Sequence, residues 1–224
     1  MMEEPISGIC DITLATQVAE ELLRIKAVFL RPSQPFTWAS GIKSPIYCDN
    51  RLILGYPEFR NIVCDGMLTI ISKYYKALDV VMGAATGGIP HASLVSDRLS
   101  LPMGYVRSGA KEHGRENKVE GAIELNNKNM IVVEDLISTA GSSIDVVESL
   151  RESGGIVLGI VSIFTYSLQK GIDNLIKANV RNVSLCDINT LVDVAVENGY
   201  IKANEKRMIL NFIKNPSDPS WQTE

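Results

Sequence analysis

The chain contains the stretch Ile131-Val-Val-Glu-Asp-Leu-Ile-Ser-Thr-Ala-Gly-Ser-Ser143, from which both a fold and a candidate site follow. Its apolar beginning, Met130 to Val133, predicts a short strand that is buried on both faces of a parallel sheet. Two carboxylates, Glu134 and Asp135, come where that strand is expected to end, and a turn of small residues then leads into a predicted helix. Backbone N–H groups of such a turn and of a helix N-terminus attract phosphate, while carboxylates can hold sugar hydroxyls or a hydrated Mg²⁺ ion. The alternative is an ordinary strand-to-helix turn with an N-cap serine, in which two adjacent carboxylates near a buried strand would be costly without a partner.

Strands and helices are expected to alternate along most of the chain. Apolar runs predict strands at 78–82, 103–106, 130–133, 156–164 and 183–186, and helical spacing predicts helices at 57–75, 90–99, 141–153, 168–178, 188–197 and 204–215. This order is typical of a Rossmann-like α/β fold, in which helices joined by right-handed crossovers flank a parallel sheet. Before it, apolar spacing predicts a helix over 12–30, and residues 36–54 are expected to form short strands or a hairpin outside the main sheet.

These elements divide the chain into an N-terminal helix and small hood over 1–55, an α/β core over 56–215, and a loose C-terminal tail over 216–224. In open parallel sheets, ligands bind at the carboxyl ends of the strands, where the strand order reverses. Loops are expected at such ends at 83–88, 107–121 and 134–143, so the chemistry is expected there.

Composition restricts the class of protein. Of the 224 residues, 46% are hydrophobic and 21% are charged, which is typical of a globular protein with a full core. A formal net charge of −4 gives no support for nucleic-acid binding through bulk electrostatics. No apolar run reaches the ~18 residues of a membrane helix, and the acidic N-terminus is unlike a signal peptide. We expect a cytoplasmic protein without nucleic-acid or membrane partners, in which Cys10, Cys48, Cys64 and Cys186 are reduced.

Two further loops have compositions that suit an anionic ligand. Gly83-Ala-Ala-Thr-Gly-Gly88 would let backbone amides approach a phosphate closely, although a tight turn without a ligand fits these residues equally well. Residues 107–121 are long, polar and rich in glycine, which is typical either of a mobile lid or of a solvated surface loop. His91, which follows Pro90 at a helix start, is expected to be structural rather than catalytic.

The acidic stretch resembles the phosphoribosyl pyrophosphate signature of the type I phosphoribosyltransferases, and the glycine loop is similar to that family's pyrophosphate loop. Neither G-x-G-x-x-G nor a Walker motif is present. Within the family, the sequence Arg107-Ser-Gly-Ala-Lys-Glu-His-Gly114 resembles the catalytic lid of the orotate phosphoribosyltransferases. Ser40-Gly-Ile-Lys-Ser-Pro-Ile-Tyr47 is similar to the N-terminal hood of the same enzymes.

The resemblance implies transfer of ribose 5-phosphate from phosphoribosyl pyrophosphate to orotate, with Mg²⁺ as cofactor. It also implies a homodimer with shared sites, because the lid of these enzymes reaches into the neighbouring subunit. The implied catalytic residues are Arg107, Lys111, His113 and Asp135. The residues implied for phosphoribosyl pyrophosphate are Thr86, Gly87, Arg107, Lys111, His113, Glu134, Asp135, Ser138, Thr139, Ala140, Gly141 and Ser142, and those for orotate are Lys43, Tyr47, Ser138 and Thr139. No direct protein ligand to the metal is expected, because the substrate would hold Mg²⁺ and the acidic pair would reach it through water.

The chain departs from the family pattern at three places. Gly87 and Ser108 stand where some relatives have a lysine or a second basic residue. Phe164 to Tyr166 stand where enterobacterial relatives place an arginine against the orotate ring, and here they are expected to form an apolar wall. One alternative is a different base, such as a purine or xanthine. The other is a regulatory protein that keeps the pocket as a sensor, which predicts a decayed lid and an added nucleic-acid-binding segment.

Overall fold

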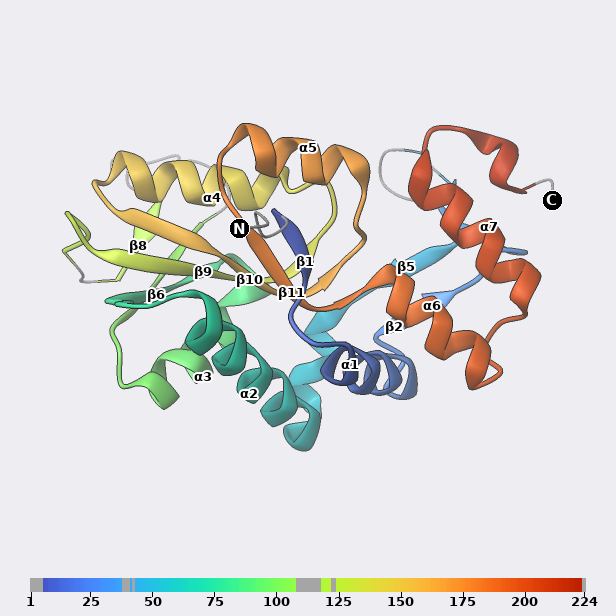
Figure 1. The fold of residues 1–224 in the computed structure, drawn as a ribbon, viewed down its shortest axis with the longest axis horizontal. Coiled ribbons are helices and arrows are strands. Elements are labelled where there is room, and N and C mark those ends of the chain that lie inside the picture. The colour runs from blue at the N-terminus through green and yellow to red at the C-terminus, as the bar shows by residue number, and fades with distance from the viewer. Residues whose placement is uncertain (1–5, 38–40, 42, 108–117, 122–123, 223–224) are drawn as a thin grey trace.

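A computed structural model describes residues 6–37, 41, 43–107, 118–121 and 124–222. Seven strands form one sheet in the order β1-β11-β10-β9-β6-β7-β8 (Figure 1). In that order they are Ser7–Ile9, Asn182–Asp187, Ile156–Thr165, Asn129–Ile137, Val80–Ala84, Met103–Val106 and Val119–Glu120. Every neighbouring pair is parallel except β7 with β8. The expected α/β fold with a parallel sheet is therefore confirmed.

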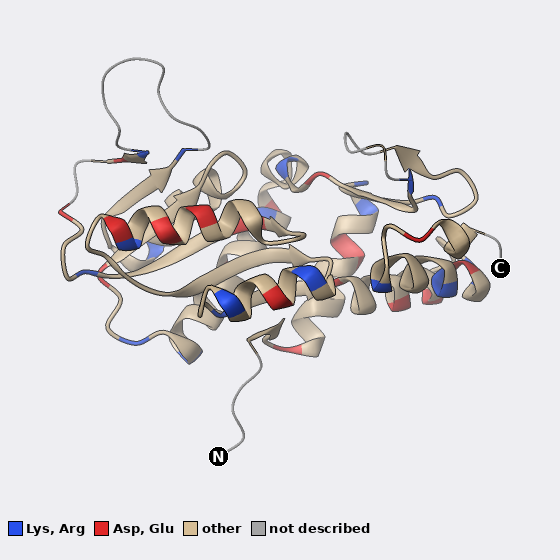
Figure 2. Cartoon of the chain, turned by 90° about the horizontal axis from the view of Figure 1, so that it is seen from above, with Lys and Arg blue, Asp and Glu red and all other residues tan. Residues whose placement is uncertain are grey.

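Helices cover both faces of this sheet, and strand side chains alternate between them. One face is covered by α1 (Ile12–Arg24), α2 (Pro57–Tyr74) and α3 (Gly88–Leu99), and the other by α4 (Gly141–Glu152) and α5 (Gln169–Lys177) (Figures 1 and 2). In β9, Ile131 and Val133 join the first core cluster, whereas Met130 and Val132 join the second. All four side chains are fully buried, as the continuous apolar run predicts for a central parallel strand.

The hood lies beside the sheet and consists of short elements. β2 (Val28–Leu30) pairs with β5 (Ile46–Cys48), and β3 (Phe36–Thr37) pairs with β4 (Lys43–Ser44), both antiparallel. A 3-10 helix, η1 (Asn50–Gly55), leads from the hood into α2. The prediction of short strands outside the main sheet is confirmed. The closing helices α6 (Ile188–Glu197) and α7 (Ala203–Lys214) lie on the hood side of the molecule (Figure 1).

The structure differs from the sequence predictions at several element ends. α1 ends at Arg24, and residues predicted as its last turn form β2 instead. β9 continues past Val133 to Ile137, because β10 still pairs with it there. The edge strands β1 and β8 were not predicted. The tail was predicted to be loose, but in its described part, up to Gln222, a second 3-10 helix, η2 (Pro219–Gln222), buries Trp221 against Phe212 with ring centroids 5.5 Å apart.

The strand order reverses between β6 and β9. From β6 the chain crosses through α3 to β7 on one side, whereas β9, β10 and β11 extend the sheet on the other. β6 pairs with β9 only as far as Gly83 and Val133, so Glu134 and Asp135 lie where β9 has lost this neighbour. The acidic pair therefore stands at the kind of crevice that binds ligands in open parallel sheets.

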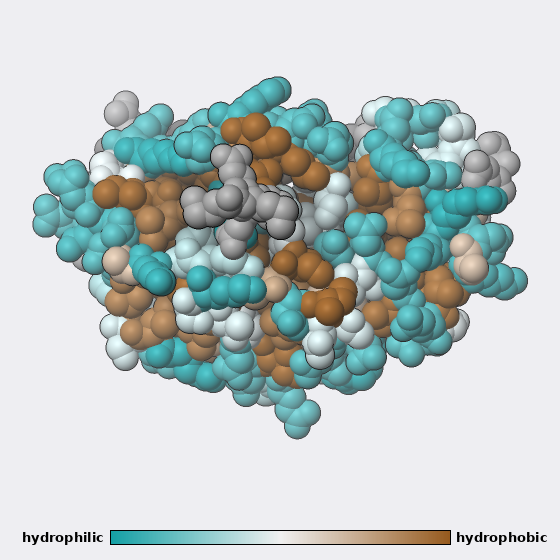
Figure 3. Space-filling view, in the orientation of Figure 1, coloured by the Kyte–Doolittle hydropathy of each residue, from teal (hydrophilic) through white to brown (hydrophobic). Residues whose placement is uncertain are grey.

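None of the helices in the described parts of the chain is long and apolar enough to cross a membrane. On the face shown in Figure 3, groups of apolar residues are separated by hydrophilic ones. All four cysteines are free thiols, in line with the expected reduced state.

Candidate active site

A cavity of about 100 Å³ lies where the predicted loops meet. The end of β6 and the loop after it contribute Ala84 and Ala85, and the segment around the lid contributes Arg107 and Lys118. The acidic stretch and α4 contribute Glu134, Ser142, Asp145, Val146 and Ser149. The structure therefore brings together residues from all of the loops that the sequence placed at strand ends.

Glu134 is a buried carboxyl group that connects β9 to α4. Its side chain is held by two hydrogen bonds: Ser143 Oγ donates to Oε2 at 2.9 Å, and the backbone N–H of Asp135 donates to Oε1 at 3.1 Å. Burial, together with the neighbouring Asp135 carboxylate, raises the pKa of Glu134 to about 8. Both carboxyl oxygens therefore already have internal donors, and the raised pKa favours the protonated form of the group near neutral pH.

Asp135 is more exposed than Glu134 and lies against the glycine loop. A Cβ atom added to Gly87 would lie 2.3 Å from Asp135 Cγ, and one added to Gly88 would lie 2.2 Å from the carbonyl oxygen of Val133. No side chain fits at either position while β9 stays in place. Glycine here serves the close approach of two loops, which explains why a lysine at position 87 would not fit this arrangement.

The loop predicted to bind phosphate runs from Ser138 to Ser142 into the N-terminus of α4. Ala140 adopts a left-handed conformation with φ of 60°, and α4 begins at Gly141. The exposed Gly141 and Ser142 leave the first N–H groups of this twelve-residue helix accessible to an anion.

Helix α5 holds this loop from the other side, which the sequence did not predict. Asn174 Nδ2 donates to the carbonyl oxygen of Thr139 at 2.9 Å. A Cβ atom at Gly171 would lie 2.5 Å from the carbonyl oxygen of Ser138, so helix and loop are in close contact. Asn174 and Thr139 are thirty-five positions apart in the sequence, and no motif in the sequence indicates this contact.

Arg107 lies directly after β7 and lines the cavity. Its Nη1 donates to Glu120 Oε1 at 3.2 Å, and its backbone N–H donates to the carbonyl of Lys118. Lys118 is a second cation at the cavity that was not singled out from the sequence, although it belongs to the same basic loop. Lys111 and His113, predicted for the lid, lie outside the described residues, as does Ser108.

Lys43 and Tyr47, the hood residues predicted to bind orotate, are both exposed. Lys43 on β4 donates from Nζ to Thr37 Oγ1 at 2.6 Å. Tyr47 on β5 is 42% exposed, and its ring centroid lies 5.7 Å from that of Phe36. No described contact joins Lys43 to the cavity, whereas Tyr47 lies two residues before Asp49, in the segment that contacts β9.

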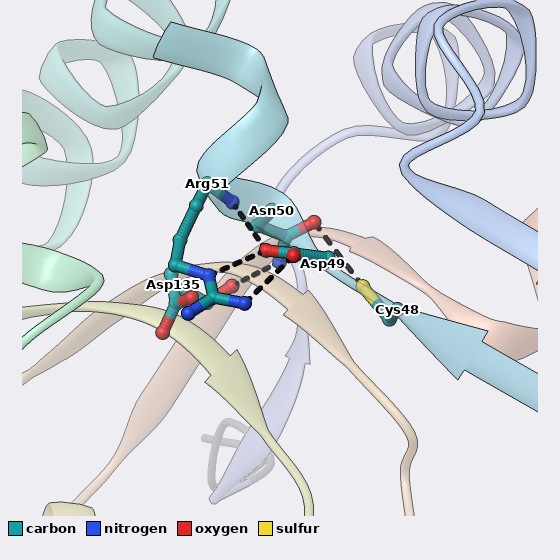
Figure 4. A network of polar contacts seen from close by, with 5 residues as sticks. All are labelled: Cys48, Asp49, Asn50, Arg51 and Asp135. Carbon is teal, nitrogen blue, oxygen red and sulfur yellow. Dashed lines mark hydrogen bonds and ion pairs between the residues drawn. The ribbon is translucent and has the colours of Figure 1, made fainter.

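That segment is attached to Asp135 by a buried amide. Asn50 is 1% exposed, its Nδ2 donates to the carbonyl oxygen of Asp135 at 2.6 Å, and its Oδ1 accepts from Cys48 Sγ at 3.2 Å (Figure 4). The sequence did not identify Asn50, because its partner lies eighty-five positions further along the chain.

The remaining predicted residues take different positions. Thr86 is exposed in the glycine loop, and the peptide bond that precedes it is cis. His91 is 2% exposed, and burial lowers its pKa to about 4, which agrees with a structural role. Phe164 is fully buried in the core, so the prediction that it forms a wall against the ligand is wrong.

Comparison with known proteins supports one family. The model of the phosphoribosyl transferase domain matches residues 57–219. The orotate phosphoribosyltransferase of Bacillus cytotoxicus is 53% identical over 207 residues, which are 92% of this chain and 98% of that protein. Orotate phosphoribosyltransferase from Aeropyrum pernix has a TM-score of 0.71 and 31% identity, and the match covers 83% of this chain and 99% of that one. Leishmania donovani UMP synthase has a TM-score of 0.75 at 24% identity, with 89% of this chain and 42% of that chain covered, which shows a shared fold.

The sheet, the loops at its switch point and the matched domain together define a class: the chain belongs to the phosphoribosyltransferase family. Within that family, identity over nearly the whole length of its bacterial relatives makes it a member of the orotate phosphoribosyltransferases. Both steps of the resemblance found in the sequence are thereby confirmed.

Proposed function

We propose that this chain transfers ribose 5-phosphate from phosphoribosyl pyrophosphate to orotate, giving orotidine 5′-monophosphate and pyrophosphate in pyrimidine biosynthesis. The observation that carries the proposal is the 53% identity to an orotate phosphoribosyltransferase over 92% of the chain. The cavity supports it, since it joins a helix N-terminus suited to phosphate with a cation, Arg107, suited to pyrophosphate.

Orotate is an anion at neutral pH through its carboxylate, and its ring nitrogen releases its proton to solvent as it bonds to C1′. The difficult step is breaking the bond between C1′ and the pyrophosphate oxygen, which leaves positive charge on the ribose and negative charge on the leaving group. Residues 138–142 would hold the 5′-phosphate, and Asp135 would hold the ribose hydroxyls and stabilise the positive sugar. Glu134, whose oxygens already accept from Ser143 and the Asp135 N–H, would fix the geometry of these groups.

The basic groups around the lid would stabilise the departing pyrophosphate. Arg107 would exchange its ion pair with Glu120 for the pyrophosphate, because the two charges are partly exposed and weakly held. Lys111 and His113 would complete this cationic surface and could donate a proton to the leaving oxygen. We further propose that they act in the neighbouring subunit of a homodimer.

Asp135 also fits a role near Mg²⁺. It is a partly exposed carboxylate at the switch point, and no group of three or more candidate metal ligands occurs among the described residues. These residues fit an ion held chiefly by phosphoribosyl pyrophosphate, with Asp135 reaching its water shell. When bound there, Mg²⁺ would neutralise charge on the pyrophosphate.

The test is consumption of orotate, followed by its absorbance, with phosphoribosyl pyrophosphate and Mg²⁺ present. A panel of adenine, hypoxanthine, xanthine and uracil serves as the control for base choice. We expect turnover with orotate and with none of the other bases. Turnover of a purine in its place, or binding of phosphoribosyl pyrophosphate without turnover of any base, would contradict the proposal.

A further inference from the structure

Arg51 is a cation at the base of the hood that the predicted site did not include. Its side chain is 66% exposed on η1. Nε donates to Asp49 Oδ1 and Nη2 to Asp49 Oδ2, both at 2.7 Å, so one edge of the guanidinium is fixed by a bidentate pair (Figure 4). Nη1 has no hydrogen-bond partner among the described residues. The other edge, formed by Nη1 and the second N–H of Nη2, therefore remains for another carboxylate.

The position of this guanidinium relative to Asp135 is set by the neighbouring residue. Asn50 is buried and donates to the Asp135 carbonyl oxygen at 2.6 Å, which holds η1 against β9. Figure 4 shows the Arg51 side chain extending from η1 toward Asp135. Since Asp49 fixes the end of the side chain and Asn50 fixes its base, the cation is preorganised in the structure.

Two residues of the proposed site, Tyr47 and Asp135, lie near Arg51. The Asp49 carboxylate raises the pKa of Arg51 most, and Tyr47 and Asp135 raise it further, so the cation lies in the field of both. Tyr47 is the residue predicted beside the base, and Asp135 is the carboxylate proposed for the ribose. A cation near both of these groups is suited to bind a negative charge that lies where base and ribose are joined.

The chemistry of orotate puts a negative charge at that place. Its carboxylate is on the ring carbon next to the nitrogen that bonds to C1′, so in the product it lies beside the ribose. Uracil and the purines carry no such group. We propose that Arg51 binds the carboxylate of orotate and thereby makes the site selective for orotate over uncharged bases. This inference rests on the proposed function.

The position Phe164 to Tyr166 does not supply this charge. Phe164 is fully buried and Tyr166 is 4% exposed, so neither offers a cation or an accessible surface to the ring. Arg51 reaches the same ligand from the hood, and its pair with Asp49 leaves the guanidinium oriented for a second, planar anion.

The experiment compares binding of orotidine 5′-monophosphate and uridine 5′-monophosphate, which differ only in this carboxylate. Isothermal titration with the full chain is expected to show that the wild type prefers the first. Arg51→Gln should weaken binding of orotidine 5′-monophosphate by about 10- to 100-fold, the range of a lost hydrogen bond between charged groups, and change that of uridine 5′-monophosphate by less than about twofold. Arg51→Lys, which keeps the charge, should recover part of the preference.

The matched control is Arg98→Gln, because Arg98 is also an exposed arginine paired with an aspartate, Asp65, but lies on α3 away from Asp135. It should leave both affinities unchanged. In steady-state kinetics, Arg51→Gln should raise the KM for orotate and leave that for phosphoribosyl pyrophosphate within about twofold. The ratio of the two affinities is measured on one protein, so a general loss of stability cannot imitate the expected result.

Several results would overturn the inference. If Arg51→Gln weakens the binding of both nucleotides equally, Arg51 has a structural role. If it raises only the KM for phosphoribosyl pyrophosphate, Arg51 contacts the pyrophosphate and not the carboxylate of orotate. An unchanged preference in Arg51→Gln would also overturn it while leaving the proposed function intact. A wild type that neither turns over orotate nor distinguishes the nucleotides would instead overturn the proposed function.

Discussion

At the scale of single residues, the buried carboxyl group of Glu134 makes stability depend on pH. Burial and Asp135 raise its pKa to about 8, whereas in the unfolded chain a glutamate ionises at about 4.3. Between these values only the folded state keeps the proton, so the free energy of unfolding should fall as the pH rises from about 5 to 8. In Glu134→Gln the side chain cannot ionise. Between pH 5 and pH 8 its free energy of unfolding should therefore fall by at least about 1 kcal/mol less than that of the wild type, as measured by urea unfolding at both pH values.

The control for this prediction is Asp145→Asn, which removes an exposed negative charge from the same cavity. It should leave the difference between the two pH values as in the wild type. If Glu134→Gln loses stability between pH 5 and 8 as steeply as the wild type, another group is responsible for the dependence.

Position 87 needs a glycine because the Asp135 side chain lies so close to it. Its backbone conformation is not the reason, since a φ of −69° suits any residue. In Gly87→Ala, the new Cβ would lie 2.3 Å from Asp135 Cγ, so the carboxylate or the loop must move. Misplacement of a reacting group by about 1 Å costs about 100-fold in rate, and we expect a loss of that order in kcat/KM.

Gly55→Ala is the matched control, because Gly55 has a negative φ and nothing within 4 Å of the added atom. Activity assays and thermal unfolding of both variants check the prediction. Near-wild-type kcat/KM in Gly87→Ala would mean that Asp135 tolerates displacement and is not a precisely positioned part of the site.

At the scale of secondary-structure elements, α5 fixes the phosphate loop through Asn174. In Asn174→Ala the carbonyl of Thr139 loses its donor, and a hydrogen bond of about 1 kcal/mol corresponds to a rise of about 5-fold in the KM for phosphoribosyl pyrophosphate. The KM for orotate should change less. Gln169→Ala, which removes an exposed side-chain bond to Asp173 on the same helix, should leave both constants unchanged. Equal effects of the two variants would show that α5 acts through its general stability.

The end of a helix could be predicted where the residue type indicates a left-handed backbone conformation. α6 was predicted with the bounds it has, and it is followed by Gly199 in the left-handed conformation, with Tyr200 N–H donating to the Ala195 carbonyl. α1 ends with the same pattern, since Ala27 N–H donates to the Leu22 carbonyl, but Lys26 takes the left-handed position. A lysine gives no such signal, so the helix was extended into residues that form β2.

The loops of the site could be predicted because each is a continuous motif at a strand end. Asn50, Asn174 and Arg51 could not be identified in this way. The two asparagines act through backbone carbonyls far away in sequence, and the position of Arg51 depends on the contact of Asn50 with β9. Such contacts are set by the packing of η1 and α5 against the sheet, which a single sequence does not specify.

At the scale of the whole molecule, the proposed dimer makes the lid and the acidic stretch parts of different subunits in one site. Lys111 would then act on the transition state, where charge develops on the pyrophosphate, more than on the bound substrate. Lys111→Ala is expected to lower kcat by at least about 100-fold with a change in KM for phosphoribosyl pyrophosphate below about 5-fold. Steady-state and single-turnover kinetics check this prediction. An unchanged kcat would show that the lid takes no part in the chemical step.

Sharing of sites between subunits can be tested by combining two inactive chains. In a heterodimer of Lys111→Ala with Asp135→Asn, one site contains both defects and the other contains neither, provided that each lid serves its neighbour. Co-expression with two different affinity tags and purification through both should therefore yield about half of the wild-type activity, as two-fold symmetry requires. If each lid serves its own subunit, every site keeps one defect and the heterodimer is as inactive as its parents. Failure to recover any doubly tagged protein would contradict the dimer itself.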